Sequence, residues 1–383
     1  MNILQVSPYF HPHLGGVENH VYHLALKLKE RGHQVTVLTS RLPGTKEEEE
    51  VGGLRVVRER AWGFPMSTPI CPGIKRRVRD LAADLVHAHT PPPLDSYYAA
   101  KGCARIGRPL VLTYHCDPIV SGPLGNLLLR VYRRVWAPAT FRRATRVIVT
   151  TKSYAATSLV AWMHEHDVVQ QAVDTGVFRP TGTGAALREK LKVGDDVVVL
   201  FVGRMVPHKG VQHLIRAIPH LDKNVRLWLV GDGPELGRMK ALARADGTAS
   251  RATFLGRVSD DELPSYYDAC DIFTLPSVSR LEAFGIAALQ GMSTAKPVVV
   301  CDIPGVREVV STGVHGLVAE PANPESLAGC INLLARDPEG RKLMGLRARE
   351  RVEQEFAWSE VVGKIEKIYD EVLDRQGAVA RKS

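Results

Sequence analysis

The chain has 383 residues, of which 45% are hydrophobic and 24% charged, and its formal net charge is +9. This length is too large for one ordinary hydrophobic core and suits two domains. It contains no run of 18 apolar residues and no leader-like start, so we expect neither a transmembrane helix nor a signal peptide. The six scattered cysteines include no CxxC pair, which indicates reduced cytoplasmic thiols and argues against a disulfide framework or a zinc site.

Short apolar runs alternate with helical patterns along the whole chain. In the first half they predict a helix over 17–31 and six buried strands. These strands are 4–7, 34–39, 54–57, 85–88, 110–114 and 147–150. A turn-rich segment, 178–184, interrupts the pattern, which then restarts. The strands of the second set are 197–202, 225–230, 252–255, 272–275, 297–300 and 316–318. The repeat predicts an α/β protein of two doubly wound domains, over 1–178 and 184–359.

The excess positive charge lies in the first half of the chain. Residues 1–178 hold 22 Lys and Arg against 14 Asp and Glu. Such a region suits nucleic acid, an anionic membrane surface or an anionic small molecule. No groove-reading motif or set of interleaved aromatic residues is present, so we expect no nucleic-acid partner.

Two glycines, Gly15 and Gly16, follow the first predicted strand and precede the first helix. Glycine lets a ligand approach the backbone closely, and a helix N-terminus offers free N–H groups to a phosphate. A plain strand-to-helix turn is the alternative.

Two cations follow the first strand of the second half, in Gly203-Arg204 and Lys209-Gly210. A guanidinium fork together with an ammonium point charge is a common pairing for a diphosphate. The alternative is a pair of solvated charges on a loop.

Glu282 precedes a helix that we expect to start near Phe284-Gly285, with Gln290 two turns further on. A carboxylate accepts hydrogen bonds from vicinal hydroxyls, and the exposed amides after it bind phosphate or hydroxyl oxygens. An acid that merely favours the helix dipole is the alternative.

His115 ends the fifth strand, where an imidazole can donate to a sugar hydroxyl or polarise a leaving phosphate. A satisfied buried histidine is the alternative, and this second interpretation is favoured for His87 and His89. No DxD sequence follows a strand, which predicts no divalent-metal site. The absence of GxGxxG argues against a dinucleotide oxidoreductase.

Taken together, these motifs resemble the retaining glycosyltransferases of family four, whose GT-B architecture consists of two Rossmann-like domains facing a shared cleft. The resemblance extends over nearly the whole chain and continues through Gly231-Asp232-Gly233-Pro234, Pro276-Ser277 and Val314-His315-Gly316-Leu317-Val318. It implies transfer of a hexosyl unit from a UDP- or GDP-linked sugar, with no cofactor besides this donor and no metal. It also implies that residues 360–383 pack back onto the N-terminal domain.

The resemblance implies a role for each motif. The catalytic residues would be His115, Arg204, Lys209 and Glu282, with the two cations on the donor diphosphate and Glu282 on sugar hydroxyls. The donor-binding residues would be Gly15, Gly16, Gly203, Arg257, Val258, Leu263, Phe284, Gly285, Ile286, Ala287 and Gln290. Arg257, Val258 and Leu263 fall where the family holds the nucleobase. Gln290 departs from the family, which usually has a glutamate there, so the nucleotide preference can differ.

The acceptor is the least defined part of this interpretation. Arg130, Arg133 and Arg134 interleave with apolar residues in 127–136, and a basic, partly apolar helix suits an anionic membrane surface. The resemblance implies a lipid-linked acceptor at the cytoplasmic leaflet, since related enzymes often use one, whereas a core-facing helix with solvated arginines is the alternative interpretation of 127–136. A soluble small-molecule glycosyltransferase, a non-hydrolysing nucleotide-sugar epimerase and a non-catalytic sugar-binding protein remain the rival functions.

Overall fold

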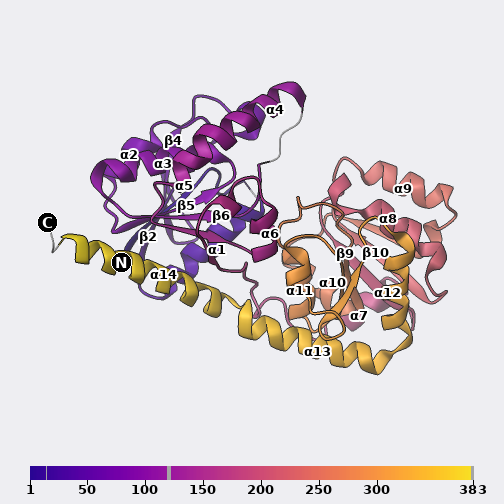
Figure 1. Ribbon diagram of the computed structural model, residues 1–383. Helices are drawn as coiled ribbons and strands as arrows, with labels where there is room; N and C mark the ends of the chain where they lie inside the picture. The colour runs from indigo at the N-terminus through magenta and orange to yellow at the C-terminus, as the bar shows by residue number, and fades with distance from the viewer. Residues whose placement is uncertain (14, 119–121, 381–383) are drawn as a thin grey trace. The chain divides into compact units, whose positions relative to one another are not determined.

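The computed structural model describes residues 1–13, 15–118 and 122–380, which form two compact units (Figure 1). Unit 1 comprises Met1–Gln170 and the chain from Trp358 onward, and unit 2 comprises Gln171–Ala357. The last three residues of the segment 360–383, which was expected to pack on the N-terminal domain, lie outside the described residues.

The unit boundary falls earlier than the turn-rich segment 178–184 predicted. The Val173 N–H donates to the Phe356 carbonyl at 2.9 Å, and Phe178 packs in a hydrophobic core of unit 2. The segment before the turns therefore belongs to unit 2. Turn-forming residues indicate an exposed loop. They do not indicate whether the residues before that loop pack in the core of unit 1 or in the core of unit 2.

Unit 1 contains an eight-stranded sheet in the order β3-β4-β2-β1-β5-β6-β7-β8. Its strands are β1 (Asn2–Ser7), β2 (Gln34–Arg41), β3 (Glu48–Val51), β4 (Leu54–Arg60), β5 (Leu85–Thr90), β6 (Leu110–Tyr114), β7 (Arg146–Val149) and β8 (Asp167–Val168). Every pair is parallel except β3 with β4. All six predicted strands are present. The two edge strands were missed because β3 reads Glu-Glu-Glu-Val, without apolar alternation, and β8 has two residues.

The helices of unit 1 surround this sheet. They are α1 (Gly16–Glu30), α2 (Ile74–Asp80), α3 (Pro93–Ile106), α4 (Gly122–Val131), α5 (Ala137–Phe141), α6 (Lys152–Thr157) and α14 (Trp358–Ala380). Several of them, including α1 and α3, pack apolar side chains against the sheet. On α1 the buried stripe includes Val21, Leu24 and Leu28. Helix α14 is attached to the sheet by a buried hydrogen bond from Gln5 Nε2 to the Tyr369 hydroxyl, at 3.2 Å.

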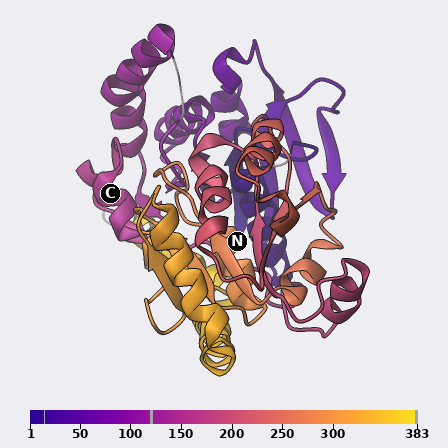
Figure 2. The same ribbon diagram turned by 90° about the vertical axis from the view of Figure 1, so that its right-hand side faces the viewer.

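A π-helical turn, Tyr132–Trp136, joins α4 to α5. The three segments follow one another as a continuous rod at the surface of unit 1 (Figures 1 and 2). Such turns are rare and occur frequently at functional sites. The sequence predicted a helix over 127–136. The structure confirms helical backbone there and shows that 132–136 form a π-helical turn.

Unit 2 contains a six-stranded, wholly parallel sheet in the order β11-β10-β9-β12-β13-β14. Its strands are β9 (Val197–Val202), β10 (Val225–Val230), β11 (Ala252–Gly256), β12 (Ile272–Leu275), β13 (Val298–Cys301) and β14 (Gly316–Ala319). The order corresponds to 3-2-1-4-5-6 in chain sequence, which is the Rossmann arrangement. All six strands predicted for this half are present.

Successive residues of β9 point into two different cores. Val198 and Leu200 join a cluster with α10 (Leu263–Ala269), α11 (Ile286–Ser293) and α13 (Pro338–Glu355). Val199 and Phe201 join a second cluster. This second cluster includes α8 (Val211–Ala217), α9 (Leu236–Ala245) and α12 (Pro324–Arg336), on the other side of the sheet (Figure 1). A short helix, α7 (Gly184–Lys190), precedes β9. Burial on both faces explains why these strands read as continuous apolar runs.

The strand order of each unit reverses at one point, between β1 and β5 in unit 1 and between β9 and β12 in unit 2. In open α/β sheets, ligands bind beyond the carboxyl ends of the strands at such a reversal. The segments that follow these four strands are therefore the first places to look for functional residues.

Candidate active site

The loops after β9, β10 and β12 in unit 2 are joined through their backbones. Met205 N–H donates to the Asp232 carbonyl at 2.8 Å, and Val278 N–H donates to the His208 carbonyl at 2.9 Å. Gly210 has a φ of 70°, and a Cβ on it would lie 1.9 Å from the Pro276 carbonyl oxygen. A side chain at this position would push the two loops apart, so only glycine permits this approach.

Lys209 and Glu282, which the sequence placed on separate motifs, form an ion pair beyond the ends of β9 and β12. Their side chains are 17% and 11% exposed, and Ser277 Oγ also donates to the Glu282 carboxylate, at 3.2 Å. Arg204 is exposed and has no ion pair among the described residues. The structure thus brings three of the four predicted catalytic residues to the same edge of one sheet.

The N-terminus of α11 lies directly after Glu282. Gly285 caps this helix with a φ of 92°, and a Cβ there would lie 3.0 Å from Leu275. The first-turn amides of Ile286 and Ala287 have no acceptor within the helix, so they can donate to an anion or hydroxyl. The Phe284 side chain is buried in the unit 2 core, which leaves its backbone as the part that can face a ligand.

Gln290 lies on α11 and is held by Tyr267 of α10. The Tyr267 hydroxyl donates to Gln290 Oε1 at 2.8 Å, so the amide oxygen is occupied and the amide nitrogen carries the remaining donors. Sequence reasoning singled out Gln290 but missed Tyr267. Its position on the buried face of α10 looks like ordinary core packing, and no sequence signal identifies its partner.

The residues expected to hold a nucleobase follow β11. Arg257 is exposed, Val258 is half-buried, and Leu263 begins α10. The Gly231 N–H donates to the Gly256 carbonyl at 2.7 Å, which places this loop next to the one after β10. Gly203, at the end of β9, approaches Gly231 so closely that a Cβ on Gly231 would lie 1.9 Å from its carbonyl oxygen.

Gly15 and Gly16 belong to unit 1, at the start of α1. A Cβ on Gly15 would lie 2.3 Å from a carboxylate oxygen of Glu18, so packing within the chain accounts for this glycine. A Cβ on Gly16 would have no atom of the described residues within 4 Å. Packing therefore does not require glycine at position 16, and its contact with a ligand stays a prediction.

His115, the fourth predicted catalytic residue, ends β6 in unit 1 and belongs to a buried hydrogen-bonded network. His89 Nε2 lies 2.7 Å from the Gln5 amide oxygen, and His89 Nδ1 lies 3.0 Å from His115 Nε2. An amide oxygen only accepts, so the neutral His89 is protonated on Nε2 and its Nδ1 accepts from His115 Nε2–H. This tautomer leaves the lone pair of His115 on Nδ1.

Burial keeps these imidazoles neutral. Desolvation lowers the pKa of both His89 and His115 well below the ordinary value, and the neighbouring histidines add to the effect. His87 hydrogen bonds Tyr369 and Thr113, and burial lowers its pKa to about 3. His87 is thus a satisfied core histidine, whereas His89 sets the tautomer of His115.

His20, Gln5 and Tyr369 join this site although sequence reasoning did not select them. The His20 and His115 rings lie 5.0 Å apart, in an edge-to-face arrangement. The sequence could have indicated that His20 is buried, because it lies four residues before Leu24, on the same apolar face of α1. Tyr369 is distant in the sequence, and only the return of α14 brings it to β1.

One group of histidine, cysteine or acidic residues in the described part of the chain has the spacing of a metal site. It consists of His20, His89 and His115, whose ligand atoms lie within 4.8 Å of one another. Neutral imidazoles are good ligands for transition metals. Both ring nitrogens of His89 are engaged by Gln5 and His115, so binding a metal requires the hydrogen bond between His89 and His115 to break.

Comparison with known proteins gives one match for each half of the chain. Residues 14–176 match the family model "Glycosyltransferase Family 4", and residues 185–351 match "Glycosyl transferases group 1". A GDP-mannose-dependent alpha-(1-6)-phosphatidylinositol monomannoside mannosyltransferase of Mycobacterium tuberculosis is 28% identical over 95% of this chain and 96% of its own. An alpha-D-kanosaminyltransferase of Streptomyces kanamyceticus is also 28% identical, over 78% and 80%.

Solved structures agree on the fold. Anabaena HepE in complex with UDP superposes with a TM-score of 0.79 at 23% identity, covering 97% of this chain and all of that one. Its likeness, together with the two parallel-sheet units, establishes the GT-B fold. From both family matches and this fold, the chain belongs to the group 1 glycosyltransferases, of the family four type.

Proposed function

We propose that this protein is a retaining glycosyltransferase that moves a hexosyl unit from a UDP- or GDP-sugar to a lipid-linked acceptor. One observation carries the proposal. Arg204, Lys209 and Glu282 gather at the strand reversal of the unit 2 sheet, next to the free amides of α11. Cations beside a carboxylate and helix amides suit a ligand that combines a diphosphate with hydroxyl groups.

The ion pair between Lys209 and Glu282 prepares both side chains for the donor. Each charge neutralises the other while the site holds no donor, which limits the cost of their partial burial. On donor binding, the Lys209 ammonium turns to the diphosphate and the Glu282 carboxylate accepts from sugar hydroxyls. Arg204, exposed on the same loop, supplies the second cation.

The proposed reaction breaks the bond between the anomeric carbon and the diphosphate oxygen. Arg204 and Lys209 stabilise the charge that develops on that oxygen in the transition state. Glu282 is engaged by Lys209 and is proposed to orient hydroxyls, and we assign no other carboxylate of the described residues as a nucleophile. The acceptor hydroxyl therefore attacks from the face that the diphosphate leaves. Its proton passes to a diphosphate oxygen, and the anomeric configuration is retained. Two cations can neutralise the diphosphate, so we propose that the reaction needs no divalent metal.

His115 acts in this scheme as a neutral hydrogen-bonding group. We propose that it lies beside the transferred sugar, and the hydrogen bond between His89 and His115 keeps the His115 ring in one tautomer.

The proposed lipid-linked acceptor is supported by the distribution of exposed cations in unit 1. Arg77 and Arg146 are neutralised by ion pairs with acidic residues. Arg130, Arg133 and Arg134, on α4 and the π-helical turn, are exposed and have no ion pair among the described residues. No helix in the described residues has the length and apolarity to cross a membrane. We propose peripheral binding to the cytoplasmic face of an anionic membrane.

A donor screen tests the proposed reaction. We expect release of one nucleoside diphosphate from a panel of UDP-, GDP- and TDP-sugars, and equal turnover in EDTA and in Mg²⁺ or Mn²⁺. The anomeric proton coupling of the product measures retention. Conversion of the donor without any acceptor, yielding an epimeric sugar, would instead identify an epimerase. No nucleotide release from any donor would leave a sugar-binding protein, and activity restored only by metal would refute metal independence.

A further inference from the structure

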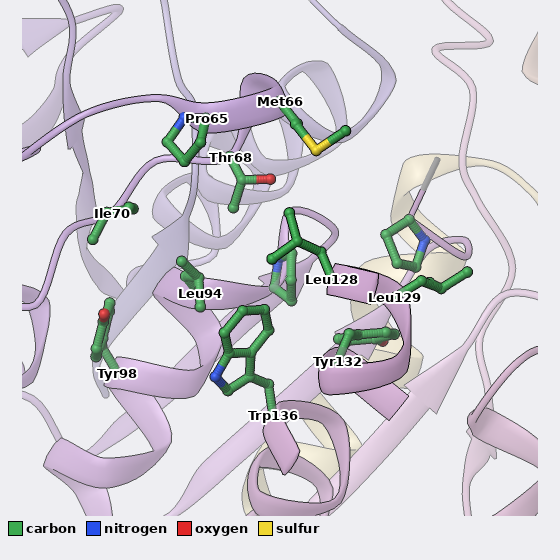
Figure 3. Close-up of a pocket in the computed structure, with 12 residues that line it drawn as sticks. Pro65, Met66, Thr68, Ile70, Leu94, Tyr98, Leu128, Leu129, Tyr132 and Trp136 are labelled. Carbon is green, nitrogen blue, oxygen red and sulfur yellow. The ribbon is translucent and has the colours of Figure 1, made fainter. Parts of the chain in front are cut away.

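An apolar cavity of about 270 Å³ lies in unit 1 (Figure 3). Its walls come from the loop 65–70 after β4, from the start of α3, and from α4 with the π-helical turn. None of its twelve lining residues carries a charge. In Figure 3, Met66 and Ile70 lie opposite Leu128 and Trp136, with Leu94 between the two groups.

The cavity lies near the carboxyl ends of β5 and β6 in the unit 1 sheet. Leu94 comes four residues after the end of β5, and Pro118 comes three residues after His115. Tyr132 also lines the cavity, but its hydroxyl hydrogen bonds Tyr114 of β6, so its polar atom is satisfied within the fold. A ligand in the cavity therefore contacts the apolar part of this ring.

A stripe of apolar side chains leads out of the cavity to solvent. Leu128, Tyr132 and Trp136 line the cavity at four-residue spacing, and Leu124 continues the same step outward. Tyr132 is 4% exposed, whereas Leu124 is 62% exposed. A soluble domain gains nothing from such exposure by itself, and large apolar side chains that extend from a cavity to the surface mark a binding site.

The loop on the opposite wall is held in a conformation that its residues do not favour. Met66 and Ser67 both have positive φ, 48° and 55°, in a region that non-glycine residues rarely adopt. The Tyr9 hydroxyl donates to the Ser67 carbonyl at 2.9 Å and fixes this conformation. Strained backbone of this kind concentrates at binding sites, and here it positions Met66 against the cavity.

We propose that this cavity binds the hydrocarbon chain of the lipid acceptor. Charge complementarity favours a lipid with an anionic head group. The rod that provides Leu128, Tyr132 and Trp136 also carries Arg130, Arg133 and Arg134 at its exposed positions. A chain that lies in the cavity and along the stripe contacts the same rod that carries these cations. This inference rests on the proposed transfer to a lipid acceptor and specifies which residues recognise its apolar part.

Intrinsic fluorescence tests the inference without catalysis. The probe is dodecyl phosphate brominated in mid-chain, used below its micelle concentration, because bromine quenches a tryptophan that it contacts. We expect saturable quenching that falls by more than half in Trp136→Phe. Leu128→Phe, which fills the cavity, should weaken probe binding about tenfold. Leu333→Phe, at a 64% exposed position of α12, is the matched control and should leave binding unchanged.

Two competitors identify which part of the ligand is recognised. Methyl phosphate should not displace the probe, and phenyl phosphate should displace it less well than unbrominated dodecyl phosphate. Displacement by methyl phosphate would show an anion site only, and tighter binding of phenyl phosphate would indicate an aromatic acceptor. Either result overturns the inference, as does unchanged binding in a folded Leu128→Phe. If that variant does not fold, Trp136→Phe tests the inference: quenching that does not fall by more than half in this variant overturns it.

The proposed function is judged by a separate measurement. UDP and GDP binding to the wild-type protein is followed by calorimetry, in the absence of any lipid. Failure of nucleotide binding with intact quenching counts against the glycosyltransferase proposal only. Nucleotide binding without quenching counts against the cavity only.

Discussion

The two units share one way of winding a parallel sheet, yet they place opposite kinds of chemistry at its carboxyl edge. Unit 2 presents the exposed Arg204 and a largely buried ion pair between Lys209 and Glu282. Unit 1 presents His89 and His115, buried and neutral, with an uncharged cavity nearby. Topology thus fixes where a ligand binds, and the residues on the loops decide whether charge or apolar contact binds it.

The largest difference between the units should appear on acidification. His87, His89 and His115 are neutral in the folded state because their pKa values lie below the ordinary 6.5, whereas the unfolded chain binds protons at 6.5. The folded state therefore binds fewer protons, and its stability falls as the pH drops below 6.5. Well below pH 6.5 each histidine should cost on the order of 1 kcal/mol per pH unit, so the three together should cost a few kcal/mol per pH unit.

Hydrogen exchange followed by mass spectrometry can resolve this effect by unit. Peptides from β5 and β6 should lose protection between about pH 6.5 and 5.5, with exchange rates corrected for the intrinsic pH dependence. Peptides from β9 and β10 serve as the internal control, since His208, His213 and His315 of unit 2 are only half-buried. Equal loss of protection in both units would contradict the comparison.

Removing a cation from unit 2 should have the next largest effect. Lys209→Ala and Arg204→Ala should each lower kcat/KM on the order of 10²-fold, because each removes a group that stabilises the leaving diphosphate. Arg216→Ala, an exposed arginine on α8, is the control. Loss of Lys209 also leaves Glu282 without its partner, so the double variant Lys209→Ala/Glu282→Ala is needed. Recovery of activity in the double variant would show a purely structural pair.

Membrane binding should depend on unit 1 alone. Arg133→Ala should weaken co-sedimentation with liposomes rich in anionic lipid about fivefold at low salt, since one cation near such a surface contributes about 1 kcal/mol. Arg244→Ala, exposed on α9 of unit 2, should leave binding unchanged. High salt should remove the difference. Absence of binding to anionic liposomes at low salt, with efficient transfer to a soluble acceptor, would refute the membrane proposal.

The smallest effect concerns Gln290. Gln290→Glu keeps the hydrogen bond from Tyr267 and exchanges the amide donors for a negative charge. We expect an unchanged melting temperature and a KM for the nucleotide sugar that shifts about threefold, as the gain or loss of one hydrogen bond does. An unchanged KM for every donor would show that Gln290 does not contact the nucleotide.

Strand positions were predictable from the sequence because both faces of each central strand are buried, which produces uninterrupted apolar runs such as Val197–Val202. The loop motifs were predictable because glycines and charged residues, such as Gly203 and Arg204, directly follow those apolar runs. The side chains that come into contact from distant parts of the sequence were not predictable. Nothing in the sequence around Glu282 selects Lys209 as its ion-pair partner, and nothing near His115 points to Tyr369. The cavity was also invisible, since Leu94, Met66 and Trp136 become neighbours only in the folded unit.

The close backbone approach of Gly210 to Pro276 and of Gly231 to Gly203 has a consequence for engineering. The positions of the donor loops depend on these main-chain contacts and not on the side chains that face outward. The exposed Arg257 can therefore be varied in search of altered sugar-nucleotide usage, provided that both glycines are retained. A library that varies Gly210 or Gly231 should instead consist largely of misfolded clones.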